Sequence, residues 1–199
     1  MEIYKQLDDR SGQAQALQIL GWLFFGDGQL AAAEEAASQA INLQDDSDQY
    51  RVCGCHRLLG NIYKSKGETG KAIDHFEIAL GIASSFNWHY EQFWNHFSLA
   101  DLFSNQNRFD QAHAQIERAK LHVANDLFCL GQATDLHAWI LFREGRFEEA
   151  KSKASSAADV FGKFGAAIDA ERCGKILRDI EEKMKTSVAS GESDSSGSQ

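Results

Sequence analysis

The sequence predicts an all-α fold, an α–α superhelix built from four helical hairpins and closed by a C-terminal capping helix. Three observations predict it. The chain has 199 residues and no proline, the residue that is tolerated least inside a helix. Apolar residues recur at the i, i+3 and i+4 spacing of an amphipathic helix. Four similar segments follow one another at a near-constant period, which is the signature of a repeat architecture.

The period is clearest in an alanine that follows a short turn in each segment. Consecutive alanines of this set are 39, 40 and 38 residues apart, and they are Ala33, Ala72, Ala112 and Ala150. We place the repeats at about 14–46, 53–85, 93–125 and 131–163, inside an array that spans residues 11–186. The residues that lengthen the period, such as 45–50 and 86–92, are expected to lie between repeats.

Each repeat is predicted to form two helices. In the second repeat, Leu59, Ile62 and Tyr63 form an apolar stripe, Gly67 breaks the helix, and a further stripe follows. Small residues recur where the two helices must approach closely, and a larger side chain there would overpack the contact at roughly 1–3 kcal/mol. These small residues are Gly21, Gly60, Ala100 and Ala138 in the first helices, and Ala40, Ala79, Ala119 and Ala157 in the second helices.

The two ends of the chain carry different predictions. Residues 1–10 read as the remnant of a preceding helix, which suggests a piece of a longer protein or a shortened gene product. Residues 167–184 predict an amphipathic capping helix that includes Ile168, Ile176 and Ile180, because a terminal repeat needs a polar outer face. Residues 187–199 are rich in serine and glycine, and we expect a disordered tail there.

The repeats resemble the tetratricopeptide repeat, whose pattern is W-x2-L-G-x2-Y followed by A-x3-F. The second repeat matches best, with Leu59-Gly60-x2-Tyr63 and then Ala72-x3-Phe76. The long period and the segment LGNIYKSKGETGKAIDHFEIALGIASSFNWH also resemble stand-alone fungal repeat proteins and the C-terminal arrays of fungal NACHT or NB-ARC ATPases.

The resemblance implies a non-catalytic scaffold or adaptor that binds a protein partner, as a peptide or helix, in a concave groove lined by the first helices. The groove positions carried over are Gln18, Trp22, Phe25, Arg57, Asn61, Lys64, Trp94, Phe97, Asp101, Asp135, Trp139 and Phe142. Tryptophan and arginine dominate binding hot spots, and here Arg57 and Lys64 would hold a carboxylate of the partner. The alternative is that the aromatic residues pack against neighbouring first helices.

A second function follows from the NACHT and NB-ARC resemblance, namely a ligand-sensing regulatory repeat array of a larger nucleotide-switch protein. Family members that grip the C-terminal carboxylate of a chaperone use asparagine and basic residues on three consecutive first helices. Only Arg57 and Asn61 match that set. We therefore do not favour binding of a chaperone tail.

Composition and motifs argue against other classes of function. The chain has 20 Lys and Arg against 29 Asp and Glu, a net charge of −9, which disfavours nucleic-acid and membrane partners. The segment GETGK at 67–71 lacks the earlier glycine and the following Ser or Thr of a phosphate loop. Seven histidines and four cysteines show no zinc spacing, so we expect no enzyme activity, no cofactor and no metal. The N-terminus does not resemble a secretory signal, and a cytoplasmic location is predicted.

Overall fold

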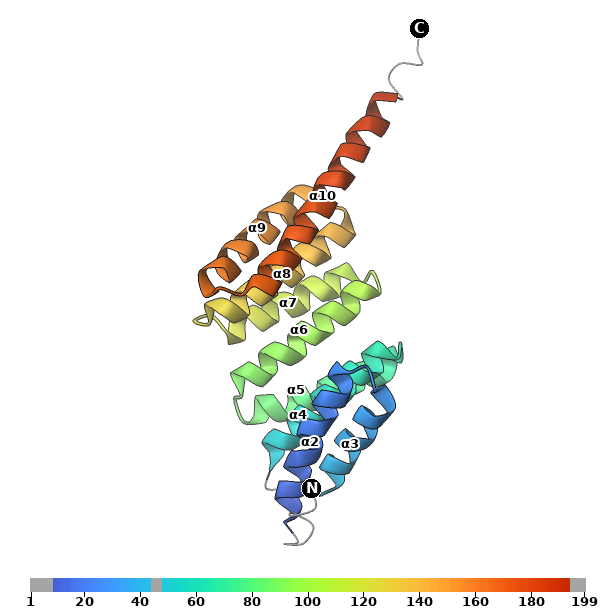
Figure 1. Ribbon diagram of the computed structural model, residues 1–199, viewed down its shortest axis with the longest axis vertical. Helices are drawn as coiled ribbons and strands as arrows, with labels where there is room; N and C mark the ends of the chain where they lie inside the picture. Colours follow the sequence, from blue (N-terminus) through green and yellow to red (C-terminus); the bar gives the residue numbers. More distant parts are fainter. Residues whose placement is uncertain (1–8, 44–47, 194–199) are drawn as a thin grey trace. The chain divides into compact units, whose positions relative to one another are not determined.

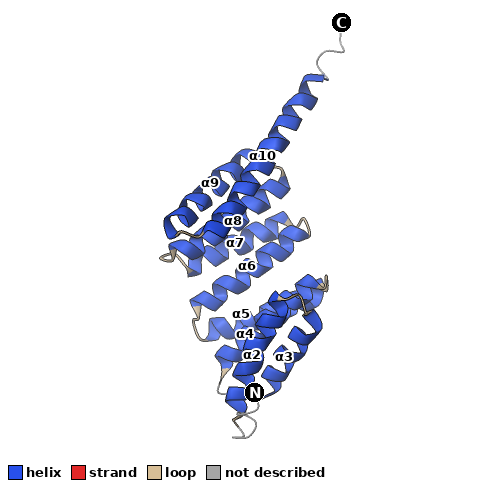
Figure 2. Cartoon of the chain, in the orientation of Figure 1, coloured by secondary structure: helices blue, strands red, loops and turns tan. Residues whose placement is uncertain are grey.

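The computed structural model describes residues 9–43 and 48–193, and every regular element in those ranges is an α-helix (Figures 1 and 2). The helices follow one another in pairs along the chain. They are α2 (Arg10–Gly26) and α3 (Leu30–Leu43), α4 (Gln49–Ser65) and α5 (Thr69–Ser85), α6 (His89–Asn105) and α7 (Phe109–His122), α8 (Leu127–Glu144) and α9 (Phe147–Phe164), and finally α10 (Ala167–Ser193). The all-α class predicted from the sequence is confirmed.

The chain divides into two compact units, Met1–Leu102 and Phe103–Gln199. In the first unit, α2 packs on α3, α3 on α4, and α4 on α5. In the second unit, α7 packs on α8, α8 on α9, and α9 on α10. Each unit is described by itself below.

The first helices begin earlier than the sequence suggested. α4 starts at Gln49 and α8 at Leu127, whereas the repeats were placed from 53 and 131. The cause is an aspartate N-cap before each helix, since the carboxylates of Asp48 and Asp126 accept backbone N–H bonds of 3.2 and 3.0 Å from Arg51 and Cys129. Among the residues that lengthen the period, 49–50 and 89–92 are therefore helical.

Tight turns join the two helices of each pair, and each turn needs one residue in the left-handed backbone region. Glycine occupies that position in three pairs, because it has no Cβ to clash. The three glycines are Gly28 (φ 75°), Gly67 (φ 75°) and Gly145 (φ 87°). In the remaining pair the residue is Asn107 (φ 59°), the next most tolerant type. The turn between α6 and α7 thus keeps the geometry without a glycine.

Helices approach closely at the predicted small residues. Between the paired helices α4 and α5, a Cβ added to Gly60 would lie 2.6 Å from Cε1 of Phe76, and between α2 and α4, one added to Gly21 would lie 2.8 Å from Cδ2 of Leu58. The predicted alanines in both helices are fully buried. The small side chains therefore set the helix spacing within each unit, as expected.

The C-terminal end of the array differs from the sequence-based expectation in two respects. The predicted helix remnant at 1–10 falls almost entirely on residues 1–8, which lie outside the described residues. At the other end, α10 buries Ile176 and Ile180 as expected, whereas Ile168 is 84% exposed. α10 continues to Ser193, into the segment expected to be disordered. Residues 194–199 lie outside the described range.

Candidate functional site

Side chains from three successive first helices meet in the first unit. The guanidinium of Arg57, on α4, lies 4.9 Å from the ring centroid of Trp22, on α2. Its Nε donates a 3.0 Å hydrogen bond to Oε2 of Glu91, on α6. Tyr50 donates its hydroxyl to the other oxygen of Glu91 at 3.3 Å. Glu91 is only 4% exposed, so this carboxylate is buried and paired, and Arg57 is held between a ring and a charge.

The rest of the predicted polar strip also makes internal contacts. Lys64, on α4, forms a 2.8 Å ion pair with Asp101, on α6, and both side chains are partly exposed. The side-chain amides of Gln18 and Asn61 donate to the backbone carbonyls of Arg51 and Arg57 at 3.4 and 3.0 Å. Arg57 and Lys64 were expected to hold a partner's carboxylate, but each already has a carboxylate within the chain.

The aromatic residues predicted for the groove of the first unit pack on each other and stay partly exposed. Trp22 and Phe25 meet edge to face with ring centroids 6.0 Å apart. Trp94 and Phe97 also meet edge to face, with ring centroids 5.4 Å apart. The ring centroids of Trp94 and Phe93 are 4.9 Å apart. The side chains therefore combine mutual packing with an accessible surface.

The second unit holds the remaining three predicted residues in a different setting. Asp135, on α8, is 5% exposed and accepts a 2.7 Å bond from Nε of Arg172, on α10. Trp139 and Phe142 stack at 5.6 Å and pack against the apolar cluster that contains Ile180. Asp135 is thus a structural residue that ties the capping helix to α8, and it is not open to a partner.

A shallow depression beside α10 is lined by Phe142, Asp179, Glu182 and Lys183 and has a volume of about 260 Å³. Phe142 gives it one apolar wall, and the other three side chains are charged. The depression suits a contact with a surface side chain of a partner better than it suits an enclosed small molecule.

Sequence analysis missed the partners Glu91, Tyr50 and Arg172. A signal for two of the ion pairs was present, since Lys64 precedes Asp101 by 37 residues and Asp135 precedes Arg172 by the same interval. That interval is close to the repeat period, so equivalent turns of neighbouring first helices carry opposite charges. A search for opposite charges one period apart would have found these pairs.

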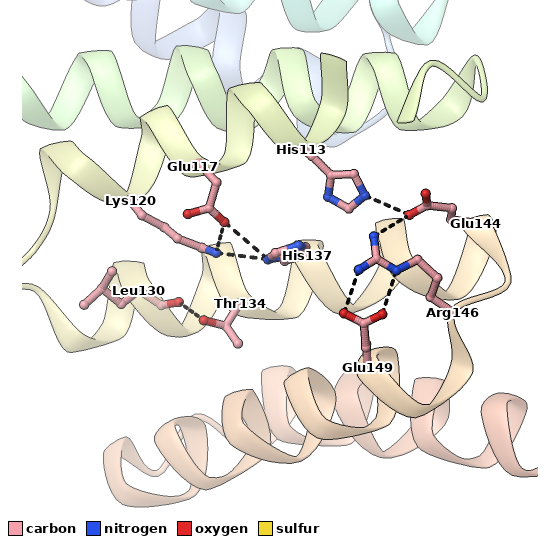
Figure 3. Close-up of polar contacts among 9 residues, drawn as sticks. All are labelled: His113, Glu117, Lys120, Leu130, Thr134, His137, Glu144, Arg146 and Glu149. Carbon is pink, nitrogen blue, oxygen red and sulfur yellow. Dashed lines mark hydrogen bonds and ion pairs between the residues drawn. The ribbon is translucent and has the colours of Figure 1, made fainter. Parts of the chain in front are cut away.

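Figure 3 shows a second polar cluster, formed by α7, α8, the turn before α9 and the first turn of α9. Nε2 of His113 lies 2.8 Å from Oε2 of Glu144, and Nδ1 of His137 lies 3.0 Å from Nζ of Lys120. Arg146 makes two bonds, of 2.7 and 2.6 Å, to the carboxylate of Glu149. These contacts connect the helices by hydrogen bonds and ion pairs.

The first unit contains another histidine pair. Nδ1 of His56, on α4, lies 2.9 Å from Nδ1 of His75, on α5, and the ring of Tyr63 stacks on His75. Burial, with a smaller contribution from His75, lowers the pKa of His56 to about 4. At neutral pH the pair is therefore uncharged and shares a hydrogen bond within the helix packing.

The four cysteines are buried free thiols. Burial raises the pKa of each thiol to about 12, so all four are protonated and unreactive at neutral pH. Among the described residues, no three His, Cys, Asp or Glu side chains are grouped so that they could hold a metal ion. Within the same residues, no helix has the length and apolar character needed to cross a membrane.

Comparison with known proteins places the chain among helical-repeat proteins. Residues 58–86 match the family model of the tetratricopeptide repeat. No curated protein matches the chain. This match shows a tetratricopeptide repeat at residues 58–86, and the solved structures described next share a helical-repeat fold with the chain.

Three solved structures share the fold at low sequence identity. Aspartyl phosphate phosphatase F from Bacillus subtilis has a TM-score of 0.75 and 17% identity over 92% of this chain and 52% of its own length. BtubC (BKLC) from P. vanneervenii has a TM-score of 0.65 and 16% identity over 92% of this chain and 85% of its own length. The pilF protein of Pseudomonas aeruginosa has a TM-score of 0.60 and 15% identity, covering 85% and 77%. The chain spans about half the length of the first of these proteins, and identities this low show the fold alone.

Proposed function

We propose that the chain is a non-catalytic scaffold or adaptor that binds a peptide or helix of a partner protein against its first helices. In the first unit, the binding surface is proposed to include Trp22, Phe25, Trp94 and Phe97. In the second unit, it is proposed to include Trp139 and Phe142. The polar contacts of Arg57 would hold α2, α4 and α6 in place beneath the partner. In this proposal the ion pairs organise the surface, and the exposed parts of the aromatic rings supply the binding energy.

One observation carries the proposal. Trp22 is covered on one face by the guanidinium of Arg57, which is itself fixed by the buried carboxylate of Glu91, and the indole is still partly exposed. An aromatic side chain that is rigid before binding loses little entropy when a partner docks on it. Rigid, partly exposed aromatic and arginine side chains are the composition found at interface hot spots.

Catalysis is not part of the proposal. The described titratable clusters consist of ion pairs and histidine contacts between helices, and the thiols are buried. The name of the Bacillus subtilis protein states a phosphatase activity, which is that protein's own. The regulatory alternative, a ligand-sensing array of a nucleotide-switch protein, stays a prediction from the sequence. Four buried free thiols suit a reducing compartment, and we propose a cytoplasmic location.

The test is affinity capture with the full chain, comparing the wild type with two variants. Trp22→Ala combined with Trp139→Ala removes one proposed contact in each unit. The control is Ile78→Ala, on the second helix α5, where the side chain is 45% exposed. We expect a partner that the wild type and the control both bind and that the double variant loses. A partner bound equally by the double variant, with an unchanged circular dichroism spectrum, would contradict the proposal.

The variant Arg57→Glu is unsuitable for this test. It would leave the buried carboxylate of Glu91 without its cation and add a second negative charge beside it. Removing one member of a buried ion pair costs about 3–5 kcal/mol, so loss of binding would report unfolding rather than a lost contact.

A further inference from the structure

His137 makes an unusual contact between α7 and α8 in the second unit. Its side chain is 14% exposed, and its Nδ1 lies 3.0 Å from Nζ of Lys120 and 3.6 Å from Oε1 of Glu117. Its ring centroid lies 5.2 Å from that of His113 in an edge-to-face arrangement. Figure 3 shows Glu117 and Lys120 on α7 directed toward the same side of the His137 ring.

The chemistry of the two nitrogens fixes the protonation state that this contact requires. A lysine ammonium has three donors and no acceptor, so Nδ1 of His137 must accept and its proton must sit on Nε2. If Nδ1 took up a proton, two N–H donors would face each other at 3.0 Å and two positive charges would be adjacent. The hydrogen bond from Lys120, on α7, to His137, on α8, therefore exists only while His137 is neutral.

The other groups around His137 do not reverse this preference. On α7, Lys120 and His113 oppose a proton on His137, whereas Glu117 favours it. On α9, Lys153 opposes the proton, and Glu149 lies close enough for its carboxylate to be stabilised by His137. Burial is the largest influence, followed by Lys120 and His113, and together they lower the pKa of His137 from its ordinary 6.5 to about 4.

We infer that the contact of His137 with Lys120 is a proton-sensitive latch between α7 and α8, which holds while His137 is neutral and loosens when His137 is protonated. The inference does not depend on the proposed partner binding. Trp139 lies two residues further along α8, so a shift of this helix on acidification would also move a proposed binding residue.

The sign of the pH dependence follows from proton linkage. The unfolded chain binds a proton at His137 below pH 6.5, whereas the folded chain does not bind one until about pH 4. Stability from this residue is therefore complete above pH 6.5 and falls as the pH decreases toward 4. For one proton with these two values, the unfolding equilibrium constant rises about 30-fold between pH 7.5 and pH 5.

The first experiment compares urea unfolding of the full chain at pH 7.5 and pH 5 for the wild type and two variants. His137→Gln replaces the ring by an amide whose oxygen accepts from Lys120 at any pH. His89→Gln is the matched control, because His89 is an exposed histidine at the start of α6. We expect the rise in the unfolding constant on acidification to be about 30-fold smaller in His137→Gln than in the wild type and unchanged in His89→Gln. A difference below about threefold between His137→Gln and the wild type would overturn the inference.

A second measurement uses the wild type alone and so does not depend on a variant that folds. Nuclear magnetic resonance titration of the histidine ring carbons reports the protonation of His137 directly. Amide hydrogen exchange at the same pH values reports the opening of α7 and α8. The latch predicts a neutral His137 at pH 6 and faster exchange in α7 and α8 once His137 titrates. Titration of His137 near pH 6.5, or unchanged exchange after it titrates, would refute the latch.

Discussion

Replacing Gly60 by alanine tests how closely the two helices of a pair approach. The new Cβ would lie 2.6, 2.7 and 2.9 Å from Cε1, Cδ1 and Cζ of Phe76. Phe76 is fully buried between α4 and α5, so its ring has no open space into which it can move. All three separations are shorter than those that Cβ atoms normally show, so the helices must separate or the ring must leave its rotamer.

The magnitude follows from two opposing effects. Overpacking a buried contact costs roughly 1–3 kcal/mol, and three simultaneous short contacts place Gly60→Ala in the upper part of that range. Alanine gains roughly 1 kcal/mol over glycine in a helix interior. The free energy of unfolding should therefore fall by about 1–2 kcal/mol.

The control is Gly81→Ala on α5, where an added Cβ would meet nothing within 4 Å. Only the helix propensity changes there, so this variant should be stabilised by roughly 0.5–1 kcal/mol. Urea unfolding followed by circular dichroism at 25 °C measures both variants. Phe76→Leu should reduce the cost of Gly60→Ala, because the smaller side chain vacates the contact. If Gly60→Ala proved as stable as Gly81→Ala, the argument from close approach would be wrong.

Two further predictions concern buried polar groups. Arg57→Gln should lower the free energy of unfolding by about 3–5 kcal/mol, because it leaves the buried carboxylate of Glu91 without its cation. The double variant Arg57→Gln, Glu91→Gln should recover most of that loss in the same urea experiment. A single variant as stable as the double variant would show that Glu91 is not buried as described. The four thiols should react with a thiol reagent at pH 8 far more slowly in the native protein than in urea, because burial raises their pKa to about 12. Rapid reaction of a thiol in the native protein would contradict that burial.

The sequence was sufficient to predict the repeat and the spacing of its helices. Small residues recur once per repeat in the first helices, and Gly60, which faces Phe76, is one of them. Both the period and the size of these side chains can be read directly from the sequence. The helices α4 and α8 begin before the repeats placed from 53 and 131, because Asp48 and Asp126 cap their N-termini. An aspartate before a helix is a local signal, and it was available in the sequence.

The side-chain interactions of the candidate site were harder to predict from the sequence. Whether Arg57 faces a partner or Glu91 depends on the rotation of α4 relative to α6, which the repeat period alone does not specify. Asp135 is buried only because α10 supplies Arg172, so its role follows from packing between helices that are distant in sequence. Side-chain pairing across helices is a tertiary property, and a pattern within one helix does not determine it.

Site-specific photo-crosslinking tests the central claim of partner binding on the first helices most directly. A photoreactive amino acid would be placed at Phe25, on α2, in one sample and at Ile78, on α5, in another, and each full-length protein would be illuminated with the captured partner. The account predicts a crosslinked product from position 25 and little or none from position 78. Crosslinking from position 78 alone would show that the partner binds the second helices, contrary to the proposal.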